Sequence, residues 1–229
     1  LYRMLPLTVA YNLELILSYP FMLAGMYLFL RRWKMPRDAC MLGAFIFTFS
    51  GFNILHYAHM NSIAVSAHIP WLLVSIDVLM RDSDSRKKRG AAVGVAFLTG
   101  SQLLLGHPTA FWLSAVTEAA YTLLILRRET IRPLIAVGVA KICGIAIGAV
   151  QLLAHWEAAL NSGRQTNSLR ALMWPSLRPM DLLQIVAPYF FNGIAFNGIP
   201  YELKVYNGAV PLALFLYLIL RFKDISQWK

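Results

Sequence analysis

Long apolar segments alternate with short charged clusters along this chain of 229 residues. No Asp, Glu, Lys or Arg occurs between Asp38 and Asp77, or from Gly90 to Thr117. A helix needs about 20 apolar residues to cross the hydrocarbon layer of a bilayer. The pattern therefore predicts an all-α, polytopic transmembrane bundle with seven spans, over residues 5–30, 39–55, 62–80, 90–106, 110–126, 133–154 and 206–220.

Residues 155–205 have a different character, because aromatic rings and prolines such as Trp156, Trp174, Pro179 and Pro188 recur in them. Tyr and Trp favour the headgroup layer of a membrane, and Pro breaks helices. We expect a long loop between the sixth and seventh spans, with short helices lying on the membrane surface. The whole range 1–229 is expected to form a single transmembrane domain.

Composition supports a membrane protein. Hydrophobic residues make up 58% of the chain and charged residues only 14%, whereas soluble proteins carry about 25% charged residues. The formal net charge of +10 would suit nucleic acid only if the basic residues formed a soluble patch. They lie beside the apolar spans instead, so no nucleic-acid partner is expected.

The basic clusters also predict an orientation. Most of the 21 basic residues follow the first, third, fifth and seventh spans, in the segments 31–37, 81–89, 127–132 and 221–229. The positive-inside rule places these segments in the cytoplasm. The turns near His56 and His107 and the long loop are then extracytoplasmic, and the protein is a multi-pass protein of the cytoplasmic membrane. Because the first visible span would begin outside, we expect a further span and outer loop before Leu1, so that this sequence is a fragment.

Polar side chains gather on the predicted outer side. They include all five histidines and Glu14, which lies about 25 Å along a helix from Arg31; the set is His56, His59, His68, His107, His155, Glu14, Asn61, Glu157 and Asn161. Each one alone is consistent with an ordinary polar loop. Together they favour a functional site, because ionisable groups near spans usually face a cavity.

The spacing of His56, His59 and Asn61 raises the question of a metal site. Two histidines are too few to define one. A divalent cation held loosely together with a phosphate-bearing substrate is favoured over a tightly bound metal, and no certain cofactor follows from the sequence.

Glu118 and Lys141 stand in the middle of the fifth and sixth spans, nine residues from Arg127 and Arg132 respectively. On two consecutive antiparallel helices they lie at equal depth, so we expect them to pair. A structural pair is favoured over a proton relay. In the alternative, the sixth span begins near Lys141, whose side chain then extends to the inner surface.

Several short motifs occur in an order that resembles a known family. They are the segment 24–32, Phe49-Ser50-Gly51-Phe52, His56, His59 and Asn61, Pro70-Trp71-Leu72-Leu73, Gly106-His107-Pro108, Gln151-Leu152-Leu153, Ser162-Gly163-Arg164, Asp181-Leu182-Leu183, Ala187-Pro188-Tyr189-Phe190-Phe191, and Tyr206-Asn207-Gly208 with Pro211-Leu212. In this order the chain resembles the bacterial YfhO membrane proteins, which are similar to GT-C glycosyltransferases.

The resemblance implies an enzyme that moves a sugar from a polyprenyl-phosphate carrier to a cell-envelope acceptor on the outer face. It places the acidic base in an outer loop upstream of Leu1, so this fragment by itself is expected to be inactive. Transfer with inversion needs a carboxylate to take the acceptor proton and cationic groups on the leaving phosphate.

The candidate site residues follow from that chemistry. Arg164 is the first choice for the phosphate, because a guanidinium binds phosphate through two hydrogen bonds. His59, His107, Asn61 and Glu14 are candidates for substrate binding. Asp181 and Glu157 are candidate helpers in catalysis, although Asp181 also suits a helix N-cap.

Two other classes of function are considered. A transporter or flippase would use Glu118, Lys141 and His68 as a path through the membrane, but the chain has no internal repeat of the kind transporters show. A non-catalytic envelope-assembly protein would leave the outer histidines scattered around the perimeter.

Overall fold

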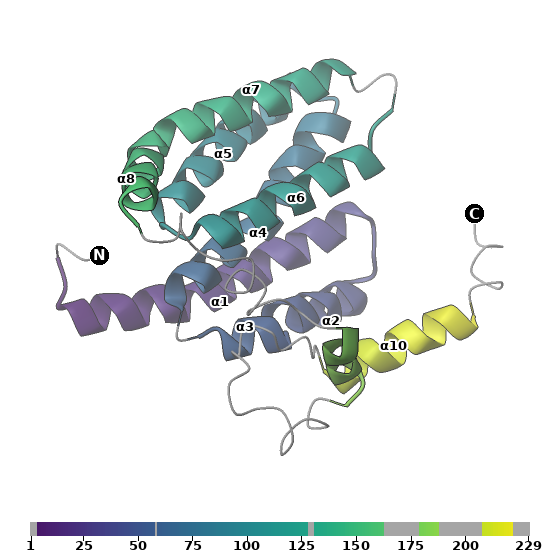
Figure 1. The fold of residues 1–229 in the computed structure, drawn as a ribbon. Helices are drawn as coiled ribbons and strands as arrows, with labels where there is room; N and C mark the ends of the chain where they lie inside the picture. Colours follow the sequence, from purple (N-terminus) through teal and green to yellow (C-terminus); the bar gives the residue numbers. More distant parts are fainter. Residues whose placement is uncertain (1–3, 58, 128–130, 163–178, 188–207, 222–229) are drawn as a thin grey trace. The chain divides into compact units, whose positions relative to one another are not determined.

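The structure is a computed structural model that describes residues 4–57, 59–127, 131–162, 179–187 and 208–221. Regular structure in these residues is entirely helical. The elements are α1 (Leu7–Arg32), α2 (Arg37–Thr48), α3 (Gly51–Leu55), α4 (Met60–Arg81), α5 (Ser85–Leu104), α6 (Pro108–Leu124), α7 (Ile131–Ile147), α8 (Ala149–Leu160), the 3-10 helix η3 (Pro179–Ile185) and α10 (Ala209–Leu220). Figure 1 shows their arrangement.

Three helical segments among the described residues are long and apolar enough to cross a membrane. They are Leu7–Arg32, Arg37–Leu55 and Asn61–Arg81, and a fourth forms if the bent pair α7 and α8 counts as one span. Their length and apolar composition are compatible with a membrane protein, as the sequence predicts. The predicted count of seven spans is not established, because α5 begins with four basic residues, α6 has 17 residues and α10 has 12.

Two predicted spans contain a break. The segment expected to form one helix over 39–55 divides into α2 and α3, and Ser50 caps α3 by accepting a hydrogen bond from the backbone N–H of Asn53. The segment expected over 133–154 divides at Gly148, where α8 turns by 64° from α7 and continues to Leu160. A Cβ at Gly148 would lie 2.5 Å from Leu103 Cβ, so only glycine allows this close approach.

The chain forms two compact units, one of residues 1–44 and 59–165 and the other of residues 45–58 and 166–229. In the second unit the described elements are the end of α2, α3, η3 and α10. The side-chain amide of Asn53 donates to the carbonyls of Phe47 and Thr48, which fixes the turn before α3.

Side-chain contacts show how the helices of the first unit run. Phe21 stacks on Trp71 and Arg32 pairs with Asp77, so α1 and α4 are parallel. Gln102 bonds to Val65, so α5 returns antiparallel to α4. The remaining contacts place α6 parallel to α4 and α7 parallel to α5; they are Tyr121 with Asp77, Ser114 with Gln102, and Gly144 with Thr99.

This arrangement brings the predicted outer and inner residues of the first unit to opposite ends. The histidine end, on the left in Figure 1, contains Glu14, His59, His68, His107 and His155. The basic end contains Arg31, Arg32, Arg81, Arg86, Lys87, Lys88, Arg89, Arg127 and Arg132.

The hydrophobic core of the first unit lies between α1, α4, α5, α6 and α7. It is built from Phe29, Leu72, Leu73, Ile76, Leu79, Met80, Val95, Tyr121, Ile125, Val137 and Ala140. Gly100 and Gly144 allow α5 and α7 to approach closely, since a Cβ on Gly144 would meet the carbonyl oxygen of Ala96 at 2.6 Å. Small residues at such contacts are typical of membrane helix packing.

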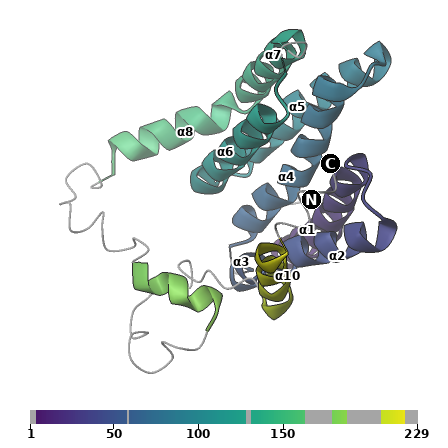
Figure 2. The same ribbon diagram turned by 90° about the vertical axis from the view of Figure 1, so that its right-hand side faces the viewer.

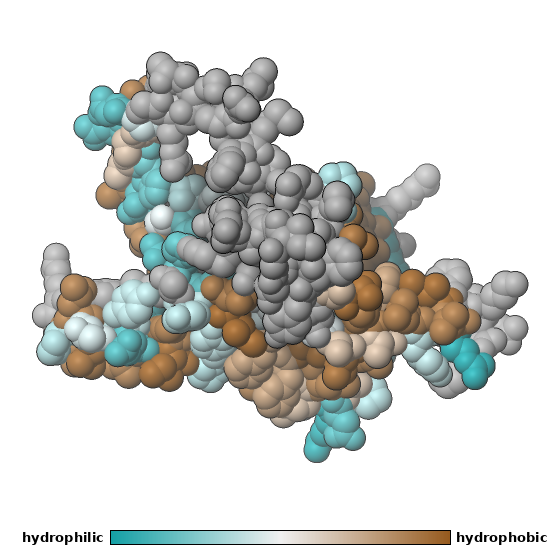
Figure 3. Space-filling model, turned by 60° about the horizontal axis from the view of Figure 1, so that its bottom comes forward, coloured by the Kyte–Doolittle hydropathy of each residue, from teal (hydrophilic) through white to brown (hydrophobic). Residues whose placement is uncertain are grey.

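Large apolar side chains also cover much of the exterior. Val93, Phe97, Val116, Ile142 and Leu123 are all more than half exposed, and brown apolar atoms cover much of the described surface in Figure 3. Soluble monomers rarely expose apolar surface on this scale. The exterior therefore fits a lipid environment.

Candidate functional site

A groove opens between α1, α4 and the turn after α5 at the histidine end. It has a volume of about 670 Å³ and is lined by Glu14, Leu17, Ser18, Pro20, Phe21, Ala64, Ala67, His68 and Leu105. Most of the wall is apolar, with a carboxylate, a hydroxyl and an imidazole among the lining groups. A volume of this size is in the range of sites for small molecules and cofactors.

His68 is held firmly in the wall of this groove. Its Nδ1 lies 2.7 Å from the carbonyl oxygen of Ala64, and its Nε2 lies 3.0 Å from the hydroxyl oxygen of Ser101. A carbonyl oxygen can only accept, so Nδ1 carries a proton, and Nε2 is the ring nitrogen that bonds to Ser101. The ring of Phe21 packs edge-on against the imidazole, with centroids 5.7 Å apart.

Glu14 and Ser18 bring polar groups of α1 to the same groove. They are four residues apart and therefore share one face of the helix. The Ser18 hydroxyl donates to the carbonyl of Glu14 at 2.7 Å. The groove thus combines a carboxylate from α1 and an imidazole from α4 with an apolar wall.

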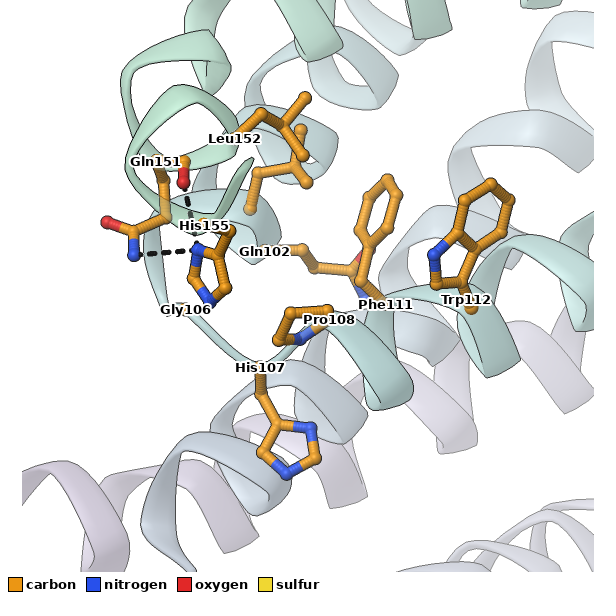
Figure 4. A pocket seen from close by; sticks show the side chains of 10 residues that line it. Gln102, Gly106, His107, Pro108, Phe111, Trp112, Gln151, Leu152 and His155 are labelled. Atoms are coloured by element: carbon orange, nitrogen blue, oxygen red, sulfur yellow. Dashed lines mark hydrogen bonds between the residues drawn. The ribbon is translucent and has the colours of Figure 1, made fainter. Parts of the chain in front are cut away.

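A second, smaller pocket of about 90 Å³ lies between the α5–α6 turn and α8 (Figure 4). Its lining joins aromatic and apolar groups to amides and imidazoles, namely Gln102, Leu103, Gly106, His107, Pro108, Phe111, Trp112, Gln151, Leu152 and His155. His107 caps α6, because its Nδ1 accepts a hydrogen bond from the backbone N–H of Ala110 at 3.1 Å. Its ring points away from Gln151 and His155 in Figure 4.

The α8 side of this pocket is ordered by a local network. His155 Nδ1 lies 2.8 Å from the carbonyl of Gln151 and 3.1 Å from its side-chain amide. Gly106, in the turn, has φ +72°, and a Cβ there would lie 3.3 Å from the Gln151 amide. The left-handed backbone at Gly106 therefore lets the turn lie against α8 without strain.

The ion pair expected between Glu118 and Lys141 is present in the bundle. Lys141 Nζ donates to Glu118 Oε2 at 2.7 Å, and the Glu118 side chain is almost fully buried. The other carboxylate oxygen accepts from Ser114, which also bonds Gln102, whose amide donates to the carbonyl of Val65. This chain of polar groups connects α4, α5, α6 and α7. Neither Glu118 nor Lys141 lines the groove or the smaller pocket described above.

A second buried carboxylate, that of Asp77, lies at the basic end. Asp77 is 1% exposed and accepts from Tyr121 at 2.6 Å and from Arg81 at 3.0 Å, with Arg32 as a further partner. Arg81 also lies over the ring of Trp33, 5.0 Å from its centroid. The i, i+4 spacing of Asp77 and Arg81 was the visible signal for part of this cluster, whereas Arg32 and Tyr121 come from distant segments.

Asp82, in the turn after α4, belongs to the electrostatics of the same end. A hydrogen bond from the backbone N–H of Asp84, aided by nearby Lys87 and Arg32, holds the pKa of the Asp82 carboxyl below its usual value. The Asp82 carboxylate therefore offsets part of the positive charge of the basic end.

The sequence-predicted site residues divide into three groups. Glu14 lines the groove and His107 lines the smaller pocket. His59 and Asn61 lie at the start of α4, at the histidine end, and Glu157 is exposed on α8. Arg164 and the side chain of Asp181 lie outside the part of the chain that the structure describes.

Sequence reasoning missed the role of Ser101 and Gln151. Both lie in apolar helices. Ser101 belongs to no motif and Gln151 stands in the Gln151-Leu152-Leu153 motif, but the role of each becomes visible only through its histidine partner. Within the described ranges, no three His, Cys, Asp or Glu side chains come together as metal ligands would.

We compared the chain with known proteins. No protein family, curated protein or solved structure matches the chain.

Proposed function

We propose that this chain belongs to a membrane glycosyltransferase that moves a sugar from a polyprenyl-phosphate carrier to a cell-envelope acceptor. The observation that carries the proposal is the groove at the histidine end, where Glu14 and His68 meet an apolar wall. A lipid-linked sugar has an isoprenoid chain and a polyhydroxylated head, so its binding site needs both kinds of surface. The ordered motifs that resemble the YfhO proteins support the same assignment.

The proposed reaction is a displacement at the anomeric carbon. A hydroxyl oxygen of the acceptor forms the new bond to this carbon, while the bond from the carbon to the phosphate oxygen breaks. The acceptor proton passes to a carboxylate base, and the carrier leaves as polyprenyl phosphate. Cationic groups or a loosely bound divalent cation stabilise the leaving phosphate, and Arg164 is the proposed contact.

The groove residues act in binding in this scheme. The Glu14 carboxylate accepts hydrogen bonds from sugar hydroxyls, the His68 ring forms part of the wall, and the side chains of Leu17, Phe21 and Leu105 pack against the isoprenoid chain. The smaller pocket, with His107 and Trp112, lies at the same end and is available to the acceptor.

The proposed topology places the histidine end outside and the basic end in the cytoplasm. The clustering of Arg and Lys at one end of the first unit supports it, because cytoplasmic ends of spans are enriched in these residues. We retain seven spans in the cytoplasmic membrane, with residues 155–205 as an outer loop, as part of this proposal.

The test is a transfer assay on membranes that contain the complete protein. Polyprenyl phosphates carrying different isotopically labelled sugars are supplied, and release of free polyprenyl phosphate and labelling of the envelope are measured. We expect Glu14→Gln to lower transfer by about tenfold, the effect of losing one polar contact of about 1.5 kcal/mol. His68→Ala should also lower transfer, because it removes part of the groove wall.

Ile16→Ala is the matched control, because Ile16 is 62% exposed on the same helix as Glu14 and does not line the groove. It is expected to leave transfer unchanged. Absence of transfer from every lipid-linked sugar by the unsubstituted protein, or equal activity of all variants, would contradict the proposal.

A further inference from the structure

Four large apolar side chains lie exposed along one side of α8. Val150, Leu153, Trp156 and Leu160 follow one another at intervals of three or four residues, and each is more than half exposed. Residues at this spacing share one side of a helix. Gln151 and His155 lie on the other side, where they line the smaller pocket.

The chain bends at Gly148, so α8 does not continue in the direction of α7. The two helices differ by 64°, and Figure 2 shows α8 leaving the end of the bundle at this angle. A helix that continued across the bilayer would follow α7, whereas one turned this far leaves the direction of the span. The bend occurs at the histidine end of the first unit, where α5 also ends and α6 begins.

The exposed apolar surface of α7 continues onto α8. Ile142 and Ile147 are 68% and 53% exposed on α7, and Val150 and Leu153 are 75% and 69% exposed directly after the bend. Whatever medium covers the outer surface of α7 therefore also meets α8. Since α7 is an apolar helix of a membrane protein, that medium is lipid.

The end of α8 suits the boundary between lipid and water. Trp156 is 69% exposed, and tryptophan prefers the headgroup layer. Glu157 lies on the same side, four residues after Leu153 and in the last turn of α8, and Asn161 and Ser162 come next. A helix with an apolar face and polar edges lies in the interface with that face turned toward the acyl chains.

We infer that α8 is an interfacial helix: it lies along the outer surface of the bilayer, inserts the face formed by Val150, Leu153, Trp156 and Leu160 into lipid, and walls the smaller pocket with its opposite face. The inference rests on insertion of the chain in a membrane and does not depend on glycosyl transfer. It places the pocket of His107 and His155 at the level of the lipid headgroups, so that a ligand enters it from the membrane surface.

Depth measurements by spin labelling test this inference. The reference variant of the complete protein carries Cys40→Ala alone, so that its label sits on the exposed native Cys143 of α7. Each test variant carries both Cys40→Ala and Cys143→Ala, with one cysteine introduced at position 150, 153, 158 or 160. The variants are reconstituted in vesicles of phosphatidylethanolamine and phosphatidylglycerol. Collision of each label with oxygen and with a water-soluble nickel chelate gives its depth.

We expect the labels at 150, 153 and 160 to lie at one shallow depth below the headgroups, with Cys143 deeper. The label at position 158, on the opposite side of α8, is expected to meet the nickel chelate. A depth that changes steadily from 150 to 160 by about 1.5 Å per residue would show a crossing helix. Labels at 150 and 153 that meet neither reagent would show a protein cover, and labels that meet only the chelate would show a water-exposed helix. Each of these three results overturns the inference.

Discussion

At the scale of single residues, the two carboxylates buried among the described residues are each held by partners. Glu118 binds Lys141 and Ser114, and Asp77 binds Arg32, Arg81 and Tyr121. A lone ionised group in a membrane interior is costly, so each carboxylate depends on its partners. These clusters tie together helices that are distant in sequence.

Removal of one member of the Glu118–Lys141 pair is therefore expected to destabilise the bundle. Lys141→Met leaves the buried carboxylate without its cation and should lower the free energy of unfolding by about 3 kcal/mol. The double variant Glu118→Leu with Lys141→Met removes both charges and should recover most of the loss. Reversible unfolding by sodium dodecyl sulfate in mixed micelles measures both, and equal losses in the single and double variants would contradict the expected pairing energy.

At the scale of elements, close approach of α5 and α7 depends on glycines. A Cβ on Gly144 would lie 2.6 Å from both the carbonyl oxygen of Ala96 and the Cβ of Thr99, whereas a Cβ on Gly138 of the same helix would meet nothing within 4 Å. The two glycines of α7 therefore differ in what an added methyl group would do.

Gly144→Ala is expected to lower the free energy of unfolding by about 2 kcal/mol, because α7 must move away from α5. Gly138→Ala is the matched control and should be neutral or stabilising by up to about 1 kcal/mol, since alanine favours the helix more than glycine. The same detergent titration distinguishes them. Equal effects at the two positions would show that the contact between α5 and α7 is looser than described.

At the scale of the whole molecule, the orientation of the chain in the membrane decides which side the groove faces. The basic and histidine ends of the first unit lie at opposite ends of its helices, so labelling one position at each end reports which end faces the cytoplasm. Ser83, in the turn after α4, and Thr109, at the start of α6, are both exposed.

Single cysteines at these two positions, with Cys40 and Cys143 replaced by Ala, provide this test. In intact cells a membrane-impermeant thiol reagent should label Thr109→Cys and spare Ser83→Cys, because the positive-inside rule keeps the basic end in the cytoplasm. Permeabilised cells provide the control, in which both positions should react. Labelling of Ser83→Cys alone in intact cells would reverse the proposed orientation and move the groove to the cytoplasmic side.

The sequence by itself determined the helical, membrane-type character of this protein and the partnership of Glu118 with Lys141. Both follow from local quantities: the length of apolar runs, and distance along a helix from a charged boundary. It also separated the basic segments from the histidines, because consecutive antiparallel helices return alternate turns to the same end.

Only the tertiary structure decided how the polar groups meet. The Nε2 of His68 bonds to Ser101 from another helix, and two partners of Asp77 come from α1 and α6. Two predicted spans are interrupted, one at Ser50, which caps α3, and one at Gly148, which packs closely on Leu103. Such contacts cannot be predicted from the spacing of apolar residues, because they join residues that are far apart in the chain.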